Sequence, residues 1–152
     1  MKPPFSVSLL TDDIRYGFSM HSLLSALRPH VHFHLCRSEE EIIQYLKGVG
    51  IYGNRDNYPV PNLLLLDSNH PKSHDLFVLQ WIKDQIEFRN LPIIFLADQQ
   101  DLLVKQAFDL GSNACAVLRQ DLNSLCEIID GIYELRGIFG HSQETISDRQ
   151  PL

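Results

Sequence analysis

Two short runs in the sequence consist almost entirely of apolar residues, NLLLLD at residues 62–67 and LPIIFLA at residues 91–97. Their length and composition are typical of strands that are buried on both faces. Such strands need helices on both sides of their sheet, and this arrangement is typical of parallel sheets in α/β proteins. The two runs therefore predict a layered α/β fold and exclude an all-helical one.

The rest of the chain alternates strand and helix patterns. HVHFHLC alternates strictly in polarity, and Ser38 and Glu41 form a capping box, typical of the start of a helix. We predict strands at residues 5–10, 30–36, 62–67, 91–97 and 113–118. We predict helices at about residues 17–27, 76–88 and 122–136, together with one that begins at residue 39 and one that ends at residue 110. This order predicts a flavodoxin-like, doubly wound sheet of five parallel strands in the order 2-1-3-4-5, with helices on both faces.

Length and charge limit the class of protein. The 152 residues suffice for one domain, which we expect at residues 1–139, followed by a polar, disordered tail at 140–152. The net charge of −6, with scattered acids, argues against nucleic-acid binding. No apolar run approaches the ~18 residues of a membrane span. Cys36, Cys115 and Cys126 lie among apolar residues, so we expect reduced thiols in a cytoplasmic protein.

Three carboxylates follow two strands that are neighbours in this strand order. Asp12 and Asp13 come after the first strand, and Asp67 comes after the third. Like charges at one end of a sheet repel, so a shared cation is expected, and oxygen ligands suit Mg²⁺. A carboxylate held in this way can also act as a nucleophile and form an acyl phosphate. The alternative is that the acids only mark where buried strands meet water.

The order of these motifs resembles a response-regulator receiver domain (CheY-like) over about Phe5–Phe139. The resemblance rests on the acidic pair, on Asp67 with Pro71 four residues later, on the fourth strand LPII, and on AFDLGSNA before the fifth strand. GVGIYGNRDNYPVPN and WIKDQIEFRNLPIIFL resemble the single-domain, phytochrome-associated response regulators.

The resemblance implies roles for several residues. Asp67 would be the phosphoacceptor that attacks a phosphohistidine of a partner histidine kinase. Mg²⁺ would be bound by the acidic pair, by Asp67 and by the backbone carbonyl of Asn69. The acidic pair is either Asp12 with Asp13 or, if the strand aligns one residue earlier, Thr11 with Asp12.

Five positions depart from the receiver pattern, and one of them is Asp75, which stands where receivers usually carry a glycine. Ala97 stands where receivers carry a hydroxyl, Cys115 where they carry an aromatic switch residue, and Leu118 and Arg119 where they carry Lys-Pro. A phosphoryl group carries about −1.5 to −2 charges, and Leu118 offers it no cation. With a shifted backbone, Arg119 could substitute for this lysine in part. We therefore expect the phosphoacceptor to be kept while the residues that respond to it are degenerate.

The expected function is a single-domain, non-enzymatic regulator of a phosphorelay with impaired phosphorylation-driven switching. It would act through contacts with a histidine kinase or another phosphorelay protein, possibly as a homodimer, and without nucleic acid or membrane. The alternative is a fully phosphorylatable regulator that accepts phosphate on Asp67. An aspartate-nucleophile phosphatase is disfavoured, because Asn69 replaces the second aspartate of that class.

Other polar and aromatic residues have two readings each. His30, His32 and His34 alternate on one face of the second strand, so two of them could share Zn²⁺, or all three could cover the exposed face of an edge strand. The long loop at 48–61 carries Tyr52 and Tyr58, which could form a docking surface. Trp81 is expected in the core.

Overall fold

The computed structural model describes residues 5–67, 74–97 and 114–149, with the side chains of 74–76 and 136–149 left aside. The chain forms two compact units, residues 1–120 and residues 121–152. The first unit contains the sheet and all three candidate carboxylates. The second is built on one helix. Each unit is described by itself.

Five parallel strands form one sheet in the order β2-β1-β3-β4-β5, which confirms the predicted fold class. The strands are β1 (Phe5–Leu10), β2 (Val31–Cys36), β3 (Leu63–Asp67), β4 (Ile93–Ala97) and β5 (Ala114–Leu118). In the central pair, Leu10 of β1 is opposite Leu66 of β3. Thr11 therefore follows β1 beside Asp67, the last residue of β3.

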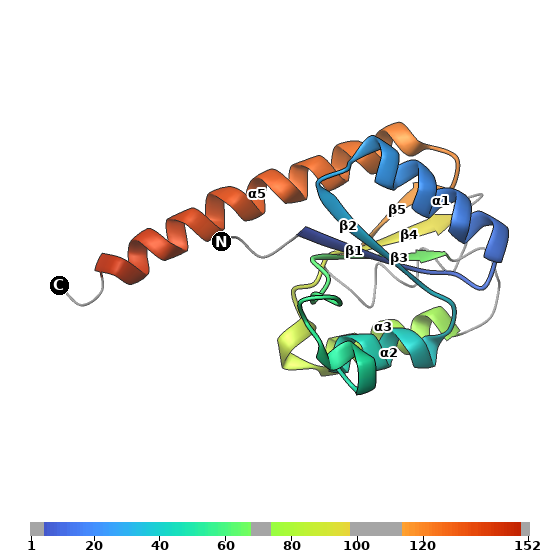
Figure 1. Ribbon diagram of the computed structural model, residues 1–152, viewed down its shortest axis with the longest axis horizontal. Coiled ribbons are helices and arrows are strands. Elements are labelled where there is room, and N and C mark those ends of the chain that lie inside the picture. Colours follow the sequence, from blue (N-terminus) through green and yellow to red (C-terminus); the bar gives the residue numbers. More distant parts are fainter. Residues whose placement is uncertain (1–4, 68–73, 98–113, 150–152) are drawn as a thin grey trace. The chain divides into compact units, whose positions relative to one another are not determined.

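Helices cover both faces of this sheet (Figure 1). Helix α1 (Ile14–Leu27) lies on one face, and α2 (Glu39–Lys47) and α3 (His74–Asp84) lie on the other. Ser38 is confirmed as the N-cap, because its hydroxyl accepts a hydrogen bond from the Glu41 N–H at 3.1 Å, whereas the Glu41 carboxylate accepts from the N–H of Arg37 instead of Ser38. The helix expected between residues 97 and 110 lies outside the described residues.

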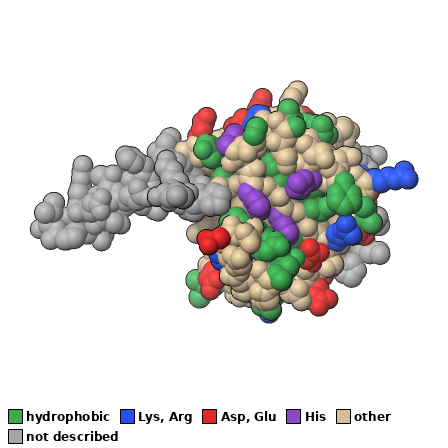
Figure 2. All heavy atoms as spheres, in the orientation of Figure 1, with side chains coloured by type: hydrophobic (Ala, Val, Ile, Leu, Met, Phe, Trp, Pro, Cys, Tyr) green, Lys and Arg blue, Asp and Glu red, His purple; other side chains and the backbone are tan. Residues whose placement is uncertain are grey.

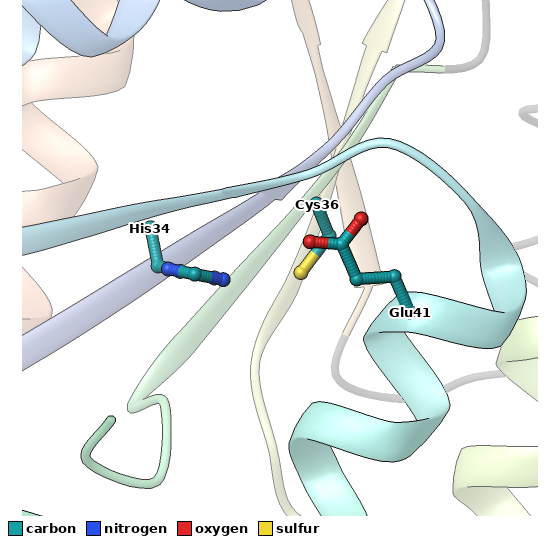
Figure 3. A group of neighbouring side chains, drawn as sticks. All are labelled: His34, Cys36 and Glu41. Atoms are coloured by element: carbon teal, nitrogen blue, oxygen red, sulfur yellow. The ribbon is translucent and has the colours of Figure 1, made fainter. Parts of the chain in front are cut away.

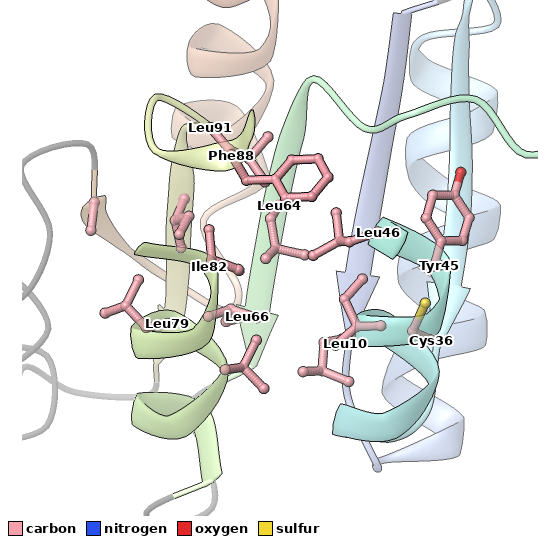
Figure 4. Packing of buried hydrophobic residues seen from close by; sticks show 14 of the residues in the cluster. Leu10, Cys36, Tyr45, Leu46, Leu64, Leu66, Leu79, Ile82, Phe88 and Leu91 are labelled. Carbon is pink, nitrogen blue, oxygen red and sulfur yellow. The ribbon is translucent and has the colours of Figure 1, made fainter. Parts of the chain in front are cut away.

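The core lies between the sheet and the α2–α3 layer (Figure 4). Leu64 and Leu66 of β3 pack there with Leu46 of α2 and Leu79 of α3, and all four are at most 2% exposed. Leu63 and Leu65 are also fully buried. Burial of successive residues confirms that this strand is covered on both faces, as its composition predicts.

Some element boundaries differ from those expected. The predicted helix at 76–88 is two elements, α3 and a 3-10 helix η2 (Ile86–Phe88), and the long loop contains a second 3-10 helix, η1 (Gly50–Gly53). In the second unit, α5 (Leu122–Arg149) continues beyond the expected end near residue 136. The expected tail is therefore helical from 140 to 149, and no proline interrupts the helix before Pro151. The boundary predicted at 139 falls inside this helix.

Candidate functional site

Asp67 ends the buried strand β3, and its side chain is only 1% exposed. The Thr11 hydroxyl donates a hydrogen bond to Asp67 Oδ2 at 2.7 Å. This contact follows from the register of β1 and β3, which places the two residues side by side. Since a buried carboxylate is costly without partners, its neighbours determine what it can do.

Arg119 contributes a cation to Asp67. Its Nη2 lies 3.1 Å from Asp67 Oδ2 and 3.3 Å from Asp13 Oδ2, so one guanidinium nitrogen bridges two carboxylates. The guanidinium carbon lies 3.7 Å from the centre of the Tyr16 ring, within the range of a cation–π contact. The Tyr16 hydroxyl also donates to the Arg119 carbonyl at 3.4 Å. Arg119 is thus held from two sides of the site.

The backbone explains why Arg119 reaches the site and Leu118 does not. Leu118 is the last residue of β5, opposite Ala97 of β4, and is 42% exposed. Arg119 continues beside β4, because its N–H donates to the Ala97 carbonyl at 3.0 Å. The next side chain along a strand points to the opposite face. Arg119 thus reaches Asp67 while its backbone is still bonded to β4.

The two carboxylate oxygens of Asp13 have different partners, one in helix α1 and one in the acidic site. Its Oδ1 accepts from the Tyr16 N–H at 3.1 Å and caps α1, while its Oδ2 faces Arg119. The Asp13 N–H donates to the Thr11 hydroxyl at 3.1 Å, and this hydroxyl in turn donates to Asp67. Asp12 is exposed. The structure therefore brings Thr11, Asp13, Asp67 and Arg119 together, and both Thr11 and Asp13 contribute.

The other predicted site residues are placed as follows. Ala97 is buried at the end of β4, where its methyl group offers no hydrogen bond. Cys115 is half-buried in β5, and burial raises the pKa of its thiol. Asn69 lies outside the described residues. Among the residues that the structure describes, the site therefore contains two carboxylates, a hydroxyl and a guanidinium.

Two of the three histidines lie on an edge strand, with the third directly before it, and the two tyrosines lie in the loop before β3. His30 is exposed, while His32 and His34 are partly buried on the edge strand β2. His34 is grouped with Cys36 and Glu41 rather than with the other two histidines. Figure 2 shows histidine side chains gathered on one face. Tyr52 is only 8% exposed and packs on the His34 ring, so the expectation that it forms a docking surface is wrong.

Comparisons with known proteins give partial sequence matches and extensive structural ones. No family model matches the chain. The chain is 30% identical over 83 residues to the response regulator Rcp1 of Synechocystis sp., a match that covers 53% of this chain and 55% of that protein. The chain thus spans about half the length of this relative.

Two solved structures resemble this chain over most of its length. The phosphorylated cyanobacterial phytochrome response regulator RcpA is 25% identical, with a TM-score of 0.66 over 86% of this chain and 91% of that one. The Mn²⁺-bound form of Rcp1 is 24% identical, with a TM-score of 0.64 over 85% and 91%. Within the described ranges, none of the helices has the length and hydropathy to cross a membrane.

Proposed function

Because the chain belongs to the response-regulator receiver family, similar to phytochrome response regulators, we propose that it is a phosphorelay component in which phosphorylation-driven switching is impaired. It would act through protein–protein contacts in the cytoplasm. Its partner would be a histidine kinase or another phosphorelay protein, and a homodimer is compatible with this role.

The observation that carries this proposal is the Arg119 guanidinium between Asp67 and Asp13. A cation attached to the chain neutralises the charges for which a receiver otherwise needs a divalent ion. Its position is supported by the Tyr16 ring and by the backbone bond to β4. The acidic site is therefore stabilised without phosphorylation and without a metal ion.

The residues around Asp67 also limit a response to phosphorylation. Ala97 has no hydroxyl that could follow a phosphoryl oxygen, and Cys115 has no aromatic ring that could change position. Phosphorylation-driven switching requires a structural element whose conformational equilibrium differs between the phosphorylated and the unphosphorylated protein. Without the hydroxyl and the aromatic ring, a phosphoryl group on Asp67 would make few contacts that favour one conformation of β4 and β5 over another.

A divalent ion fits this site only in competition with Arg119. Asp13 and Asp67 present their Oδ2 atoms to the same nitrogen, and carboxylate oxygens are suitable ligands for Mg²⁺ or Mn²⁺. A bound Mg²⁺ would reduce the negative charge that an incoming phosphoryl group meets. Asp13 and Asp67 would bind it, with Asp12 and the Asn69 carbonyl as the further ligands implied by the family, and the Arg119 side chain would have to leave its present position.

A fully phosphorylatable regulator is the second candidate, and the same contact favours it. Arg119 supplies a donor 3.1 Å from the Asp67 carboxylate, whereas Leu118 offers none. If Asp67 accepts phosphate, the guanidinium can pair with the phosphoryl oxygens in charge-assisted hydrogen bonds. The two candidates therefore differ in the response of β4 and β5.

The test is incubation with acetyl phosphate and Mg²⁺, followed by intact mass spectrometry and backbone amide NMR spectra. Asp67→Asn is the control for the site of modification. The proposal predicts either no adduct, or an adduct on Asp67 that leaves the amide shifts of β4 and β5 in place. A stoichiometric adduct that is lost in Asp67→Asn and moves the β4 and β5 resonances would overturn it in favour of the second candidate.

A further inference from the structure

A second group of potential ligands lies on the edge strand. His34 and Cys36 of β2 and Glu41 of α2 each direct one ligand atom to a common point, and these atoms lie within 4.8 Å of one another (Figure 3). His34 and Cys36 are two residues apart on a strand and so point to the same face. Glu41 lies in the first turn of α2, which begins after the Ser38 cap.

The Glu41 carboxylate is fixed by two neighbours. Its Oε1 accepts a hydrogen bond from the Tyr52 hydroxyl at 3.1 Å, and its Oε2 accepts one from the Arg37 N–H at 3.1 Å. Each oxygen keeps a further lone pair for another partner. Hydrogen bonds of this kind orient carboxylate ligands in metal sites.

The cysteine of this group is fully buried, and the histidine is partly buried. Cys36 is 0% exposed, and the His34 ring packs against Tyr45 with 4.6 Å between ring centres. His34 Nε2 is buried, and no atom of the described residues is hydrogen-bonded to it. A buried polar atom without a partner costs about 1–3 kcal/mol, so this nitrogen needs a ligand. In Figure 3 the imidazole points towards the sulfur of Cys36.

We propose that His34, Cys36 and Glu41 form a metal site for Zn²⁺, with a water molecule as the fourth ligand. Thiolate and imidazole are ligands that select Zn²⁺ over Mg²⁺ and Mn²⁺, which prefer oxygen. One thiolate and one carboxylate balance the two charges of the ion, and a neutral complex suits a buried place. When the S–Zn bond forms, the thiol proton of Cys36 leaves to solvent.

Metal binding requires the three ligand atoms to move slightly closer together. Bonds of about 2.0–2.3 Å in a tetrahedral site place the ligand atoms roughly 3.3–3.8 Å apart. Because the three atoms lie within 4.8 Å of one another, they need to approach by at most about 1 Å to come into this range. Burial lowers the pKa of His34, and the neutral imidazole is the form that binds metal. Burial and the charge of Glu41 raise the pKa of the Cys36 thiol, so it keeps its proton until a metal displaces it.

Cobalt titration tests the site, because a thiolate bound to Co²⁺ gives a charge-transfer absorption band. Co²⁺ is added to the full chain without oxygen and with a reductant that contains no thiol. We expect a band at one equivalent that Zn²⁺ abolishes, no band in Cys36→Ser, and an affinity at least about 10-fold weaker in Glu41→Gln and His34→Gln. The controls, Cys115→Ser and Asp67→Asn, should bind like the wild type.

The controls separate this site from other cysteines and from the acidic site. A band that persists in Cys36→Ser, or that is lost in Cys115→Ser, overturns the proposal, as does the absence of any thiolate band in the wild type. If Cys36→Ser does not fold, Glu41→Gln decides, because its side chain is partly exposed and its replacement preserves shape. An unchanged Co²⁺ affinity in that variant also overturns the proposal. The Asp67→Asn control keeps this outcome independent of the phosphorylation experiment.

Discussion

Replacing Arg119 with methionine removes the cation from Asp67 and keeps most of the side-chain volume. Asp67 is 1% exposed on its side chain and Arg119 is 14% exposed, so their contact at 3.1 Å is a buried ion pair. Removing one partner of such a pair leaves an uncompensated charge and costs about 3–5 kcal/mol. We expect the lower end of this range, because the Thr11 hydroxyl still donates to Asp67.

The other contacts of Arg119 contribute less to the free energy of unfolding. The Asp13 side chain is 41% exposed, and solvent-exposed pairs contribute about 0–1 kcal/mol. The cation–π contact with Tyr16 contributes about 0.5–2 kcal/mol. The total expected loss in the free energy of unfolding is thus about 3.5–6 kcal/mol. For a chain of about 150 residues this corresponds to a Tm lower by roughly 7–24 °C.

A double-mutant cycle isolates the pair. Urea unfolding is measured in EDTA for the wild type, Arg119→Met, Asp67→Asn and the double variant. In the Asp67→Asn background, Arg119→Met should cost only about 0.5–3 kcal/mol, from its contacts with Asp13 and Tyr16, because the buried charge is absent. The coupling energy should therefore be about 3 kcal/mol. A coupling within about 0.5 kcal/mol of zero would show that Arg119 does not compensate the charge of Asp67, and the reasoning for the proposed function would fail.

Three further predictions concern the metal, a turn and the edge strand. Arg119→Met should bind Mn²⁺ at least about 10-fold more tightly than the wild type by calorimetry, since the competing cation is gone; Asp67→Asn in the same background should abolish the gain. Gly48→Ala should lower the free energy of unfolding by about 1–2 kcal/mol, because Gly48 ends α2 with φ of 71°, whereas Gly131→Ala inside α5 should not destabilise. Burial lowers the pKa of His32, and nearby His21 lowers it further. In EDTA, the free energy of unfolding should therefore fall as the pH drops from about 6.5 through this lowered pKa, because the unfolded chain binds more protons than the folded chain in that range. Urea midpoints of His32→Gln across this range should show a weaker dependence, and an unchanged slope would contradict the assignment.

Much of the fold follows from local patterns. The tetra-leucine run and the run before Ala97 are buried on both faces, and Ser38 caps the start of α2 as predicted. These features depend on residues close together in the chain, so propensity and periodicity suffice. The end of α5 was mispredicted because polar residues are compatible with both a helix and a disordered tail.

The candidate site was only partly visible in the sequence. Asp67 and Asp13 were predicted to lie together because parallel strands end at one edge of a sheet. That Arg119 pairs with Asp67, and that Tyr16 supports it, depends on the register of β4 with β5 and on the path of α1. The sequence signal for this pairing is that Arg119 is a basic residue directly after β5. Alignment with the receiver pattern by position places Arg119 at the proline of Lys-Pro and not at the lysine.

The sequence by itself determined the layered α/β fold, the buried strands and the placing of an acid at the end of β3, because burial and periodicity are local properties of the chain. Only the tertiary structure decided which cation faces that acid and which ligands meet at the edge strand. Arg119 is separated from Asp67 by 52 residues, and Glu41 reaches His34 and Cys36 only after α2 turns back over β2. Contacts of this kind depend on strand order, register and helix direction together, so no local pattern of residues specifies them.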